Sequence, residues 1–514
     1  PAGIGEAKPE AVVSGVLDIL RLGKGPAESE KWAKSCIASG ECIKACDYGV
    51  NPRFLLTMAR LSMIRAEKEP AERRKQAVNV FRRLGEDVSV LSRMQLSEED
   101  LIRLGQRPSK SEERAELPDV VFYTGCNVLK TPHIALLCLD IMDKIGTDYQ
   151  VMGGPTHCCG TAQLRAGDID TLGRFANNTI QKLSQSKSKT VLAWCPSCMM
   201  QFGETVLPTV ERATGEMPFN LKAFMPFLHT QIAKVRPFLT NRVEMTVALH
   251  KHPGIAGVME AAEELLRAVP GIEIVKLDVP AMGLQSVNLA ALPKFKAELQ
   301  LRELEAARLA GVDALVAVYH SDHRELCAHE RDWPFRIMNI LEIVGASMGI
   351  QQDDHYKHLK IKQDVDAIIA DASDLMKAHK VDLDAARLQC IEPIEDEAVD
   401  PRLVLREQRP DRRGRLAQAR AAAGGARSPR GAPLPQRRRR GADHPRQRDA
   451  PVHELVADVH GAGHRAGRAG ALSLTPAAGT AAHTRPAARR RSRSSPRRRQ
   501  VRSWNLSLQK YLCR

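Results

Sequence analysis

Residues 119–126 have the sequence DVVFYTGC, a short apolar run that ends in Gly125 and is followed directly by Cys126. A polar linker over residues 105–118 precedes it. From here to residue 350, short apolar runs alternate with helical patterns, which predicts parallel strands joined by helices in β-α-β units. We therefore expect an α/β fold.

The apolar runs form a weak internal repeat. Residues 120–124 match 245–249, 149–152 match 272–275, and 190–194 match 314–319, at an offset of 123–125 residues each time. This repeat predicts two similar parallel-sheet halves that face each other, over residues 119–240 and 241–350.

Five cysteines follow the three predicted strands of the first half: Cys126, Cys158, Cys159, Cys195 and Cys198. Because binding sites form beyond the carboxyl ends of parallel strands, we expect these thiols to converge. Adjacent cysteines do not easily form a disulfide with each other, and a chain without an export signal keeps its thiols reduced. Five soft ligands exceed the four of a structural zinc site, which favours an iron–sulfur cluster. Gly160 is expected to let the backbone pass close to it.

The pattern Cys126-x31-Cys158-Cys159-Gly160-x34-Cys195-x2-Cys198 resembles the cysteine-rich CCG domain of the B subunit of heterodisulfide reductase, over about residues 119–335. Related domains occur in iron–sulfur subunits of glycolate and lactate oxidases and in a class of succinate dehydrogenase subunits. The resemblance implies that the five cysteines are both the catalytic and the metal-binding residues and hold a noncubane [4Fe-4S] cluster that splits and reduces a disulfide. Zinc, or structural or redox-sensing thiols, are the alternatives.

The second half departs from this pattern. His250 and His252 occupy the place of the first cysteine, residues 284–286 (LQS) stand where CCG is expected, and residues 320–323 (HSDH) replace the last pair. One interpretation is a histidine-rich metal or substrate site, because imidazole is a ligand and a proton carrier. The other, which we favour, is a degenerate half kept for packing, with histidines hydrogen-bonded at its surface. If disulfide cleavage needs two clusters, this chain cannot perform it as its relatives do.

Residues 1–104 are predicted to be mainly helical, with apolar residues at helical spacing over 12–22 and 54–66. Between them, Cys36-x2-Ser39-x2-Cys42-x3-Cys46 follows a ferredoxin run with serine at the second cysteine position. It resembles the second half of the helical ferredoxin domain in the heterodisulfide reductase C subunit. That implies a partial ferredoxin-like domain whose three cysteines bind a second [4Fe-4S] cluster; the alternative is a metal-free remnant. The missing first half, with no Met before Pro1, indicates a truncated start.

The composition changes near the C-terminus. Residues 1–400 carry 48 Lys and Arg against 55 Asp and Glu, whereas residues 401–514 carry 27 Arg, one Lys and six acids, with no Phe, Ile or Met. We expect a helical extension over 351–392 and then a tail over 393–514 that buries too little apolar surface to fold. The favoured interpretation is out-of-frame translation of a GC-rich gene; a functional basic arm is the alternative. Because the basic charge is confined to this tail, nucleic acid is not an expected partner of the body.

The sequence has no run of 18 uncharged apolar residues and no secretory pattern, so we expect a cytoplasmic protein without a transmembrane segment. It also lacks a GxGxxG motif for a nucleotide. The resemblance implies an iron–sulfur oxidoreductase subunit that passes electrons between a flavoprotein or ferredoxin-type partner and a thiol, disulfide or organic-acid-linked substrate. The alternative is a non-catalytic scaffold that binds zinc or carries sulfur. Cys138, on an apolar helical pattern, is expected in the core.

Overall fold

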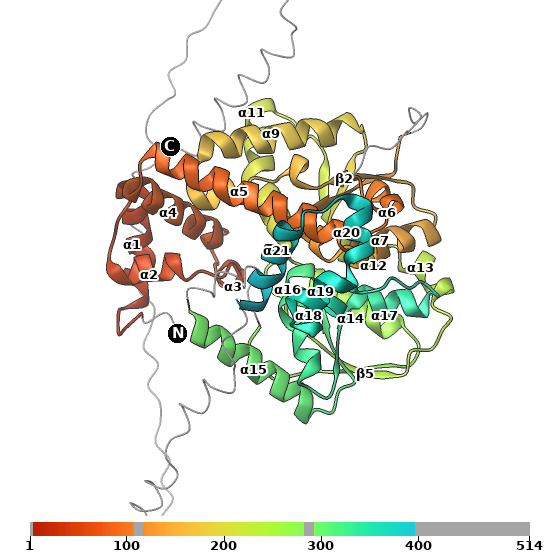
Figure 1. The fold of residues 1–514 in the computed structure, drawn as a ribbon. Helices are drawn as coiled ribbons and strands as arrows, with labels where there is room; N and C mark the ends of the chain where they lie inside the picture. The colour runs from red at the N-terminus through yellow and green to blue at the C-terminus, as the bar shows by residue number, and fades with distance from the viewer. Residues whose placement is uncertain (1–3, 107–116, 282–291, 396–514) are drawn as a thin grey trace, which may run out of the picture. The chain divides into compact units, whose positions relative to one another are not determined.

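The computed structural model describes residues 4–106, 117–281 and 292–395, with side chains up to residue 390 (Figure 1). The expectations for the linker over 107–116, for residues 284–286 and for the tail from residue 396 onward lie outside the described residues.

Two four-stranded sheets organise the described chain, and every strand pair in them is parallel. The first has the order β2-β1-β3-β4 and the second the order β6-β5-β7-β8. Their strands are β1 (Val120–Gly125), β2 (Tyr149–Gly153), β3 (Thr190–Ala193), β4 (Asn220–Ala223), β5 (Met245–Leu249), β6 (Ile272–Val275), β7 (Ala314–Ala317) and β8 (Arg336–Asn339). The predicted α/β fold with two similar parallel-sheet halves is confirmed.

The sequence did not predict the fourth strand of either sheet. β4 and β8 are four-residue edge strands, and β4 has the sequence NLKA, of which only the alanine is buried. An edge strand contacts one neighbour and part of the core, so it needs no continuous apolar run. The six predicted strands are present, although β7 ends at Ala317, before residue 319.

Helices cover both sheets and join them through a common core. In the first half they are α7 (Pro132–Lys144), α8 (Thr161–Ala166), α9 (Ile169–Gln185), α10 (Pro196–Met200), the π-helical turn η3 (Gln201–Val206), α11 (Leu207–Thr214), α12 (Phe224–Thr230) and α13 (Ile232–Val235). The second half has α14 (Val258–Ala268), α15 (Pro293–Leu309), α16 (His320–Leu326) and α17 (Ile340–Ser347). The short 3-10 turns are η1 (Asn127–Lys130), η2 (Pro155–His157) and η4 (Arg236–Phe238) in the first half and η6 (Cys327–Arg331) in the second. α7 packs against α17 and α12 against α14. Cys138 of α7 is fully buried in this core, as predicted.

The two halves meet where their central strands end. Trp194 follows β3 and Tyr319 follows β7 at the same offset as the repeat, and their ring centroids lie 6.1 Å apart, edge to face. The carboxyl edges of the two sheets therefore face each other, which places the cysteines of one half beside the histidines of the other.

The N-terminal segment forms six helices, which include the two predicted ones. They are α1 (Pro9–Leu22), α2 (Ala27–Lys34), α3 (Glu41–Lys44), α4 (Pro52–Glu67), α5 (Pro70–Arg93) and α6 (Glu98–Arg103). α1, α4 and α5 begin at proline, whose missing N–H costs nothing in the first turn. The Asn51 side chain accepts a hydrogen bond from Phe54 N and caps α4. α5 then contacts α8 of the first half.

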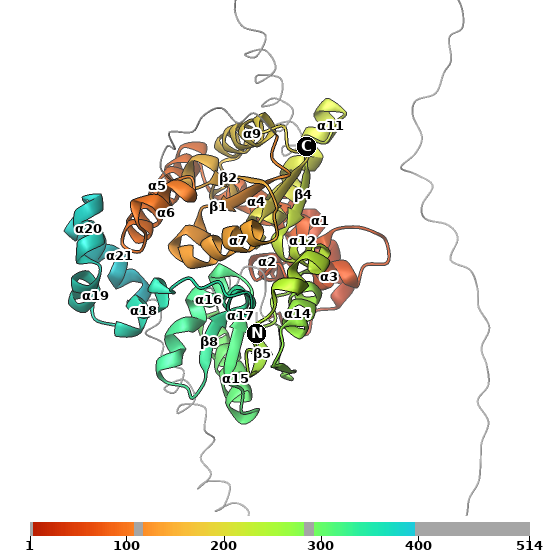
Figure 2. The same cartoon turned by 90° about the vertical axis from the view of Figure 1, so that its right-hand side faces the viewer.

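The C-terminal extension consists of four short helices: α18 (His355–Lys362), α19 (Val365–Asp371), α20 (Ser373–His379) and α21 (Leu383–Glu395). Gln363 and Lys380 adopt the left-handed conformation that ends helices, so the amphipathic pattern is interrupted. α20 and α21 pack against α5, and Figure 2 shows them beside it. Along the chain that the structure describes, no helix has both the length and the apolar composition needed to cross a bilayer.

Arg53 of α4 connects the N-terminal helices to both halves. Its guanidinium forms an ion pair with Glu204 of η3 and donates to the carbonyl oxygens of Ala38 at 3.1 Å and Gly254 at 2.7 Å. The Arg53 side chain is only 6% exposed, so loss of the cation leaves three acceptors without a partner.

We expect Arg53→Ala to lower the free energy of unfolding by about 3 kcal/mol, since it breaks a buried ion pair. Urea denaturation followed by circular dichroism measures this. Arg82→Ala is the matched control, because Arg82 pairs with Glu86 at 3.9 Å with 70% of its side chain exposed. Equal denaturation midpoints for the two variants would show that Arg53 does not stabilise the fold.

Candidate functional site

The five cysteines of the first half gather at the centre of its sheet. β1 and β3 are neighbours, but the chain continues from β1 to one edge and from β3 to the other, so the loops after them diverge and leave a crevice. Cys126 directly follows β1, Cys195 follows β3 by two residues, and the Cys158–Cys159 pair follows β2 and the turn η2. All five line one cavity of about 620 Å³, so the predicted convergence is observed in the structure.

Four of these sulfur atoms form a hydrogen-bonded chain. Cys159 shares hydrogen bonds with Cys158 and Cys198, and Cys195 shares one with Cys198. The bonds to Cys159 and Cys195 hold the pKa of those thiols well below the usual value, whereas donation to them raises the pKa of Cys158 and Cys198. Two thiolates are therefore favoured inside a buried pocket, where negative charge needs a compensating cation.

Cys126 lies at the edge of this group. It is half-buried, and burial followed by the nearby charge of Cys159 raises its pKa to about 12. All five thiols are free, with no disulfide among them.

The sulfur atoms are spread more widely than one metal ion requires. No three of the five Sγ atoms, all of which the structure describes, lie within 4.8 Å of one another. A tetrahedral zinc with Zn–S bonds of about 2.3 Å holds its sulfur ligands about 3.8 Å apart. The donor set therefore fits a core of several ions better than a single zinc.

Two glycines shape the pocket wall. Gly125 has φ +69°, and a Cβ there would lie 3.2 Å from Cys198 Sγ, so the position favours glycine for conformation and for space. Gly160 has φ +87°, and its N–H donates to Cys158 Sγ at 3.3 Å. A Cβ at Gly160 would lie 2.3 Å from the Leu172 side chain, so packing against Leu172 also restricts this position to glycine.

Polar groups from both halves surround the sulfurs. Tyr123 is 1% exposed, donates to His157 O at 2.6 Å and lies 3.9 Å from Cys198 Sγ. His320, at the start of α16, forms a hydrogen bond with Cys195 that favours its thiolate. Sequence reasoning placed His320 in the second half; its contact with Cys195 follows from the edge-to-edge arrangement of the sheets.

The histidines of the second half are buried, which corrects the expectation that they lie at its surface. His250 directly follows β5, and its Nδ1 lies 2.8 Å from Glu303 Oε2; His252 Nδ1 lies 2.7 Å from Asp322 Oδ2. Pairing with Glu303 outweighs burial and raises the pKa of His250 to about 9. Each imidazole can enter the interior because a carboxylate faces it. Glu303 was not predicted, since it lies on α15, remote in sequence.

The N-terminal cysteines lie in the segment between α2 and α4, which includes the short helix α3 and packs next to α10. Burial, then the nearby charge of Cys36, raises the pKa of Cys42 on α3. Arg60 Nη1 donates to Cys36 O at 3.1 Å, and Ala38 packs against Met200 at the end of α10. Cys46 is half-buried. Ligation by these cysteines and Ser39 remains a prediction.

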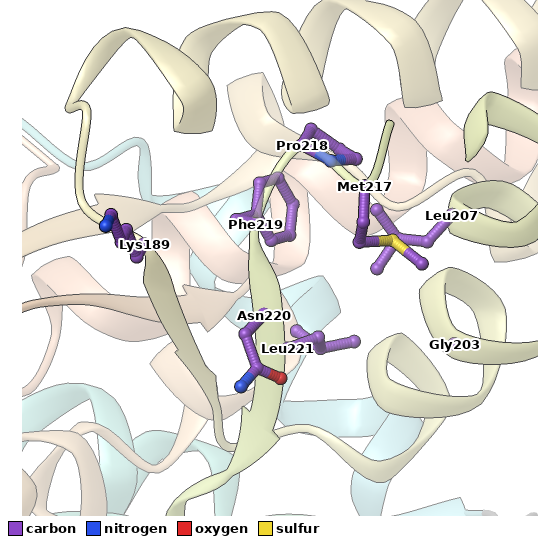
Figure 3. A pocket seen from close by; sticks show the side chains of 8 residues that line it. All are labelled: Lys189, Gly203, Leu207, Met217, Pro218, Phe219, Asn220 and Leu221. Carbon is purple, nitrogen blue, oxygen red and sulfur yellow. The ribbon is translucent and has the colours of Figure 1, made fainter. Parts of the chain in front are cut away.

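A second cavity of about 620 Å³ lies beside β4 and η3 (Figure 3). Leu207, Met217 and Phe219 line it, and Lys189 supplies its one charged group. It contains no cysteine or histidine, so we assign no chemistry to it.

The fold and the cysteine pocket define an α/β protein with a cysteine-rich domain. Residues 120–203 match the family described as CCG, cysteine-rich domain. The matched segment begins at β1 and ends just beyond Cys198, so it contains all five cysteines of the pocket.

The chain is also similar to the D subunit of dihydromethanophenazine:CoB–CoM heterodisulfide reductase from three Methanosarcina species. It is 25% identical to the Methanosarcina mazei protein over 251 residues, which are 47% of this chain and 58% of the relative. The corresponding values are 22% over 254 residues for Methanosarcina acetivorans, with 47% and 58% covered, and 23% over 264 residues for Methanosarcina barkeri, with 49% and 61% covered. The chain thus spans about three-fifths of the length of these relatives.

We expect Gly125→Ala to reduce the iron that the anaerobically purified chain retains, because the new Cβ displaces Cys198. Gly146→Ala is the control: Gly146 has φ +68°, but a Cβ there meets nothing within 4 Å. Both variants should lose about 1–2 kcal/mol of stability from the left-handed backbone, and only Gly125→Ala should lose iron. Equal iron content in the two variants would contradict this geometry.

Proposed function

We propose that this chain is an iron–sulfur oxidoreductase subunit of the heterodisulfide reductase type. In this proposal, Cys126, Cys158, Cys159, Cys195 and Cys198 hold a [4Fe-4S] cluster of the noncubane type. When bound, such a cluster accepts or donates one electron at a time next to a substrate sulfur or other reducible group. The convergence of five reduced thiols from three strand-end loops is the observation that carries the proposal.

The electrostatics of the pocket support a cationic core. Neighbouring thiols lower the pKa of Cys159 and Cys195, and a bound cationic core would displace the protons of Cys158 and Cys198, whose pKa is raised. His320 donates toward Cys195, a bond that would stabilise a sulfur ligand and tune its potential. The spread of the sulfur atoms favours several iron ions over one zinc.

The cavity beside the cysteines also has cationic groups that could bind a substrate. Arg165 of α8 interacts electrostatically with Cys159 and Cys195, and Arg324 of α16 lines the same cavity. Guanidinium groups bind carboxylates, sulfonates and phosphates through paired hydrogen bonds. We infer an anionic substrate, either a thiol/disulfide or an organic acid. Reduction of a disulfide would consume two electrons and two protons and release two thiols, with His320 as a candidate proton holder.

The N-terminal cysteines offer a route for incoming electrons. Their loop packs on α10, the helix that carries Cys198, through the contact of Ala38 with Met200. We propose that Cys36, Cys42 and Cys46 hold a second [4Fe-4S] cluster that receives electrons from a flavoprotein or ferredoxin-type partner. The partner, like the substrate, is a proposal that rests on the similarity to subunits of a multi-subunit reductase.

The first test is the composition of the full chain purified without oxygen. We expect about four iron and four acid-labile sulfide per chain from the cysteine pocket, and about eight of each if the N-terminal cluster also forms. Zinc bound to sulfur with no labile sulfide would instead support the alternative, a zinc scaffold or sulfur carrier.

Substitution then assigns the ligands. We expect Cys159→Ala to abolish the iron–sulfur absorption of the pocket cluster, because Cys159 bonds to two other ligand thiols. Cys138→Ala is the control, since Cys138 is equally buried but lies in the core on α7. Visible absorption and electron paramagnetic resonance spectra measure the effect. Identical spectra for Cys159→Ala and wild type would refute the assignment.

A further inference from the structure

A second group of ligand-type side chains includes His323 of α16, the residue next to the Asp322 that faces His252. His133 comes from α7, His323 from α16, Glu342 from α17, and Asp354 from the residue before α18. One donor atom from each of the four lies within 4.8 Å of the others. The group joins one helix of the first half to two helices of the second half and to the start of the C-terminal extension.

His133 has no hydrogen-bond partner at either ring nitrogen, although its side chain is only 2% exposed. Nδ1 lies 3.4 Å from Asp354 Oδ1 and Nε2 lies 3.5 Å from Glu342 Oε1. His323 Nε2 lies 2.6 Å from Asp354 Oδ2, whereas its Nδ1 is buried without a partner. An unsatisfied buried polar group costs about 1–3 kcal/mol, and an ion bound between these atoms would remove that cost.

The spacing is that of ligands around one ion. Zinc bonds to nitrogen and oxygen are about 2.0–2.2 Å long, which separates neighbouring ligands of a tetrahedron by about 3.3–3.6 Å. An ion would bind one nitrogen of His133, and the 3.4 Å between Nδ1 and Asp354 Oδ1 falls in this range, while Glu342 Oε1 faces the other nitrogen, Nε2, at 3.5 Å. Both distances are longer than the typical N–H···O separation of about 2.9–3.0 Å.

The charges balance one divalent cation. Glu342 and Asp354 supply two carboxylates, and each of them faces one nitrogen of His133. Two carboxylates with two neutral imidazoles neutralise a charge of +2 without further groups.

The carboxylates are already held in place by the backbone. Glu342 Oε1 accepts from Asn339 N at 2.9 Å, and Asp354 Oδ1 accepts from Lys357 N at 3.0 Å. Such outer bonds orient ligand carboxylates in metal sites. Glu342 and Asp354 also line a cavity of about 860 Å³, which provides a path for an ion from solvent.

We propose that His133, His323, Glu342 and Asp354 bind one structural zinc ion that fastens α7 of the first half to α16 and α17 of the second half and to the start of α18 in the C-terminal extension. Four protein ligands close a tetrahedral site, which is the arrangement of structural rather than catalytic zinc. The site is separate from the cysteine pocket and does not depend on the proposed function.

The test is the zinc and iron content of the full chain, produced with both metals present and purified without oxygen. We expect one zinc per chain in the wild type and at least a tenfold loss in His133→Ala and in Asp354→Asn, whose amide can still cap α18. Iron content should not change. His379→Ala is the control, because His379 is also buried but bonds to Leu96 O in the connection between α5 and α6, and it should keep the zinc.

X-ray absorption at the zinc edge decides the matter if the variants do not fold. The wild type should show nitrogen and oxygen ligands at about 2.0–2.1 Å and no sulfur at about 2.3 Å. Absence of zinc from the wild type, sulfur ligation, or full retention of zinc by His133→Ala would each overturn the proposal. Sulfur-ligated zinc without iron would count against the cysteine cluster as well, whereas an iron-loaded, zinc-free chain would refute the zinc site alone.

Discussion

The site depends on one constraint, the divergence of the chain at the centre of a parallel sheet. β1 and β3 lie side by side and their following loops go opposite ways, so the space beyond their ends cannot be filled by either loop. Cys126 and Cys195 stand at the rim of this space, and β2 adds the Cys158–Cys159 pair. Sulfur atoms that are remote in sequence thus become neighbours before any metal is considered.

The same backbone occurs twice with different donor atoms. In the first half, thiols meet at the crevice, and hydrogen bonds among them lower the pKa of Cys159 and Cys195. In the second half, imidazoles take equivalent places, and carboxylates from helices face two of them, Glu303 at His250 and Asp322 at His252. Burial of a polar group demands a partner in either case. The two halves meet this demand differently, and only the first offers soft ligands to iron.

Sequence reasoning predicted the parts of the molecule that carry strong local signals. Hydrophobic patterning predicted the six apolar strands and the internal repeat. The gathering of the five cysteines followed because binding sites form beyond the carboxyl ends of parallel strands. Sequence reasoning missed the edge strands β4 and β8, whose sequences are half polar. It also missed the helix ends at Gln363 and Lys380, because these residues adopt the left-handed conformation without being glycine. The His133 group was also invisible, because its four members lie on separate elements and share no spacing.

An iron-edge anomalous difference map of the full chain, crystallised without oxygen, tests the central claim most directly. The account predicts a compact iron peak in the crevice beyond β1 and β3, within bonding distance of sulfur atoms from all three loops. A map with no iron in that crevice, or with iron in the crevice bound by the cysteines of only one of the three loops, would contradict it.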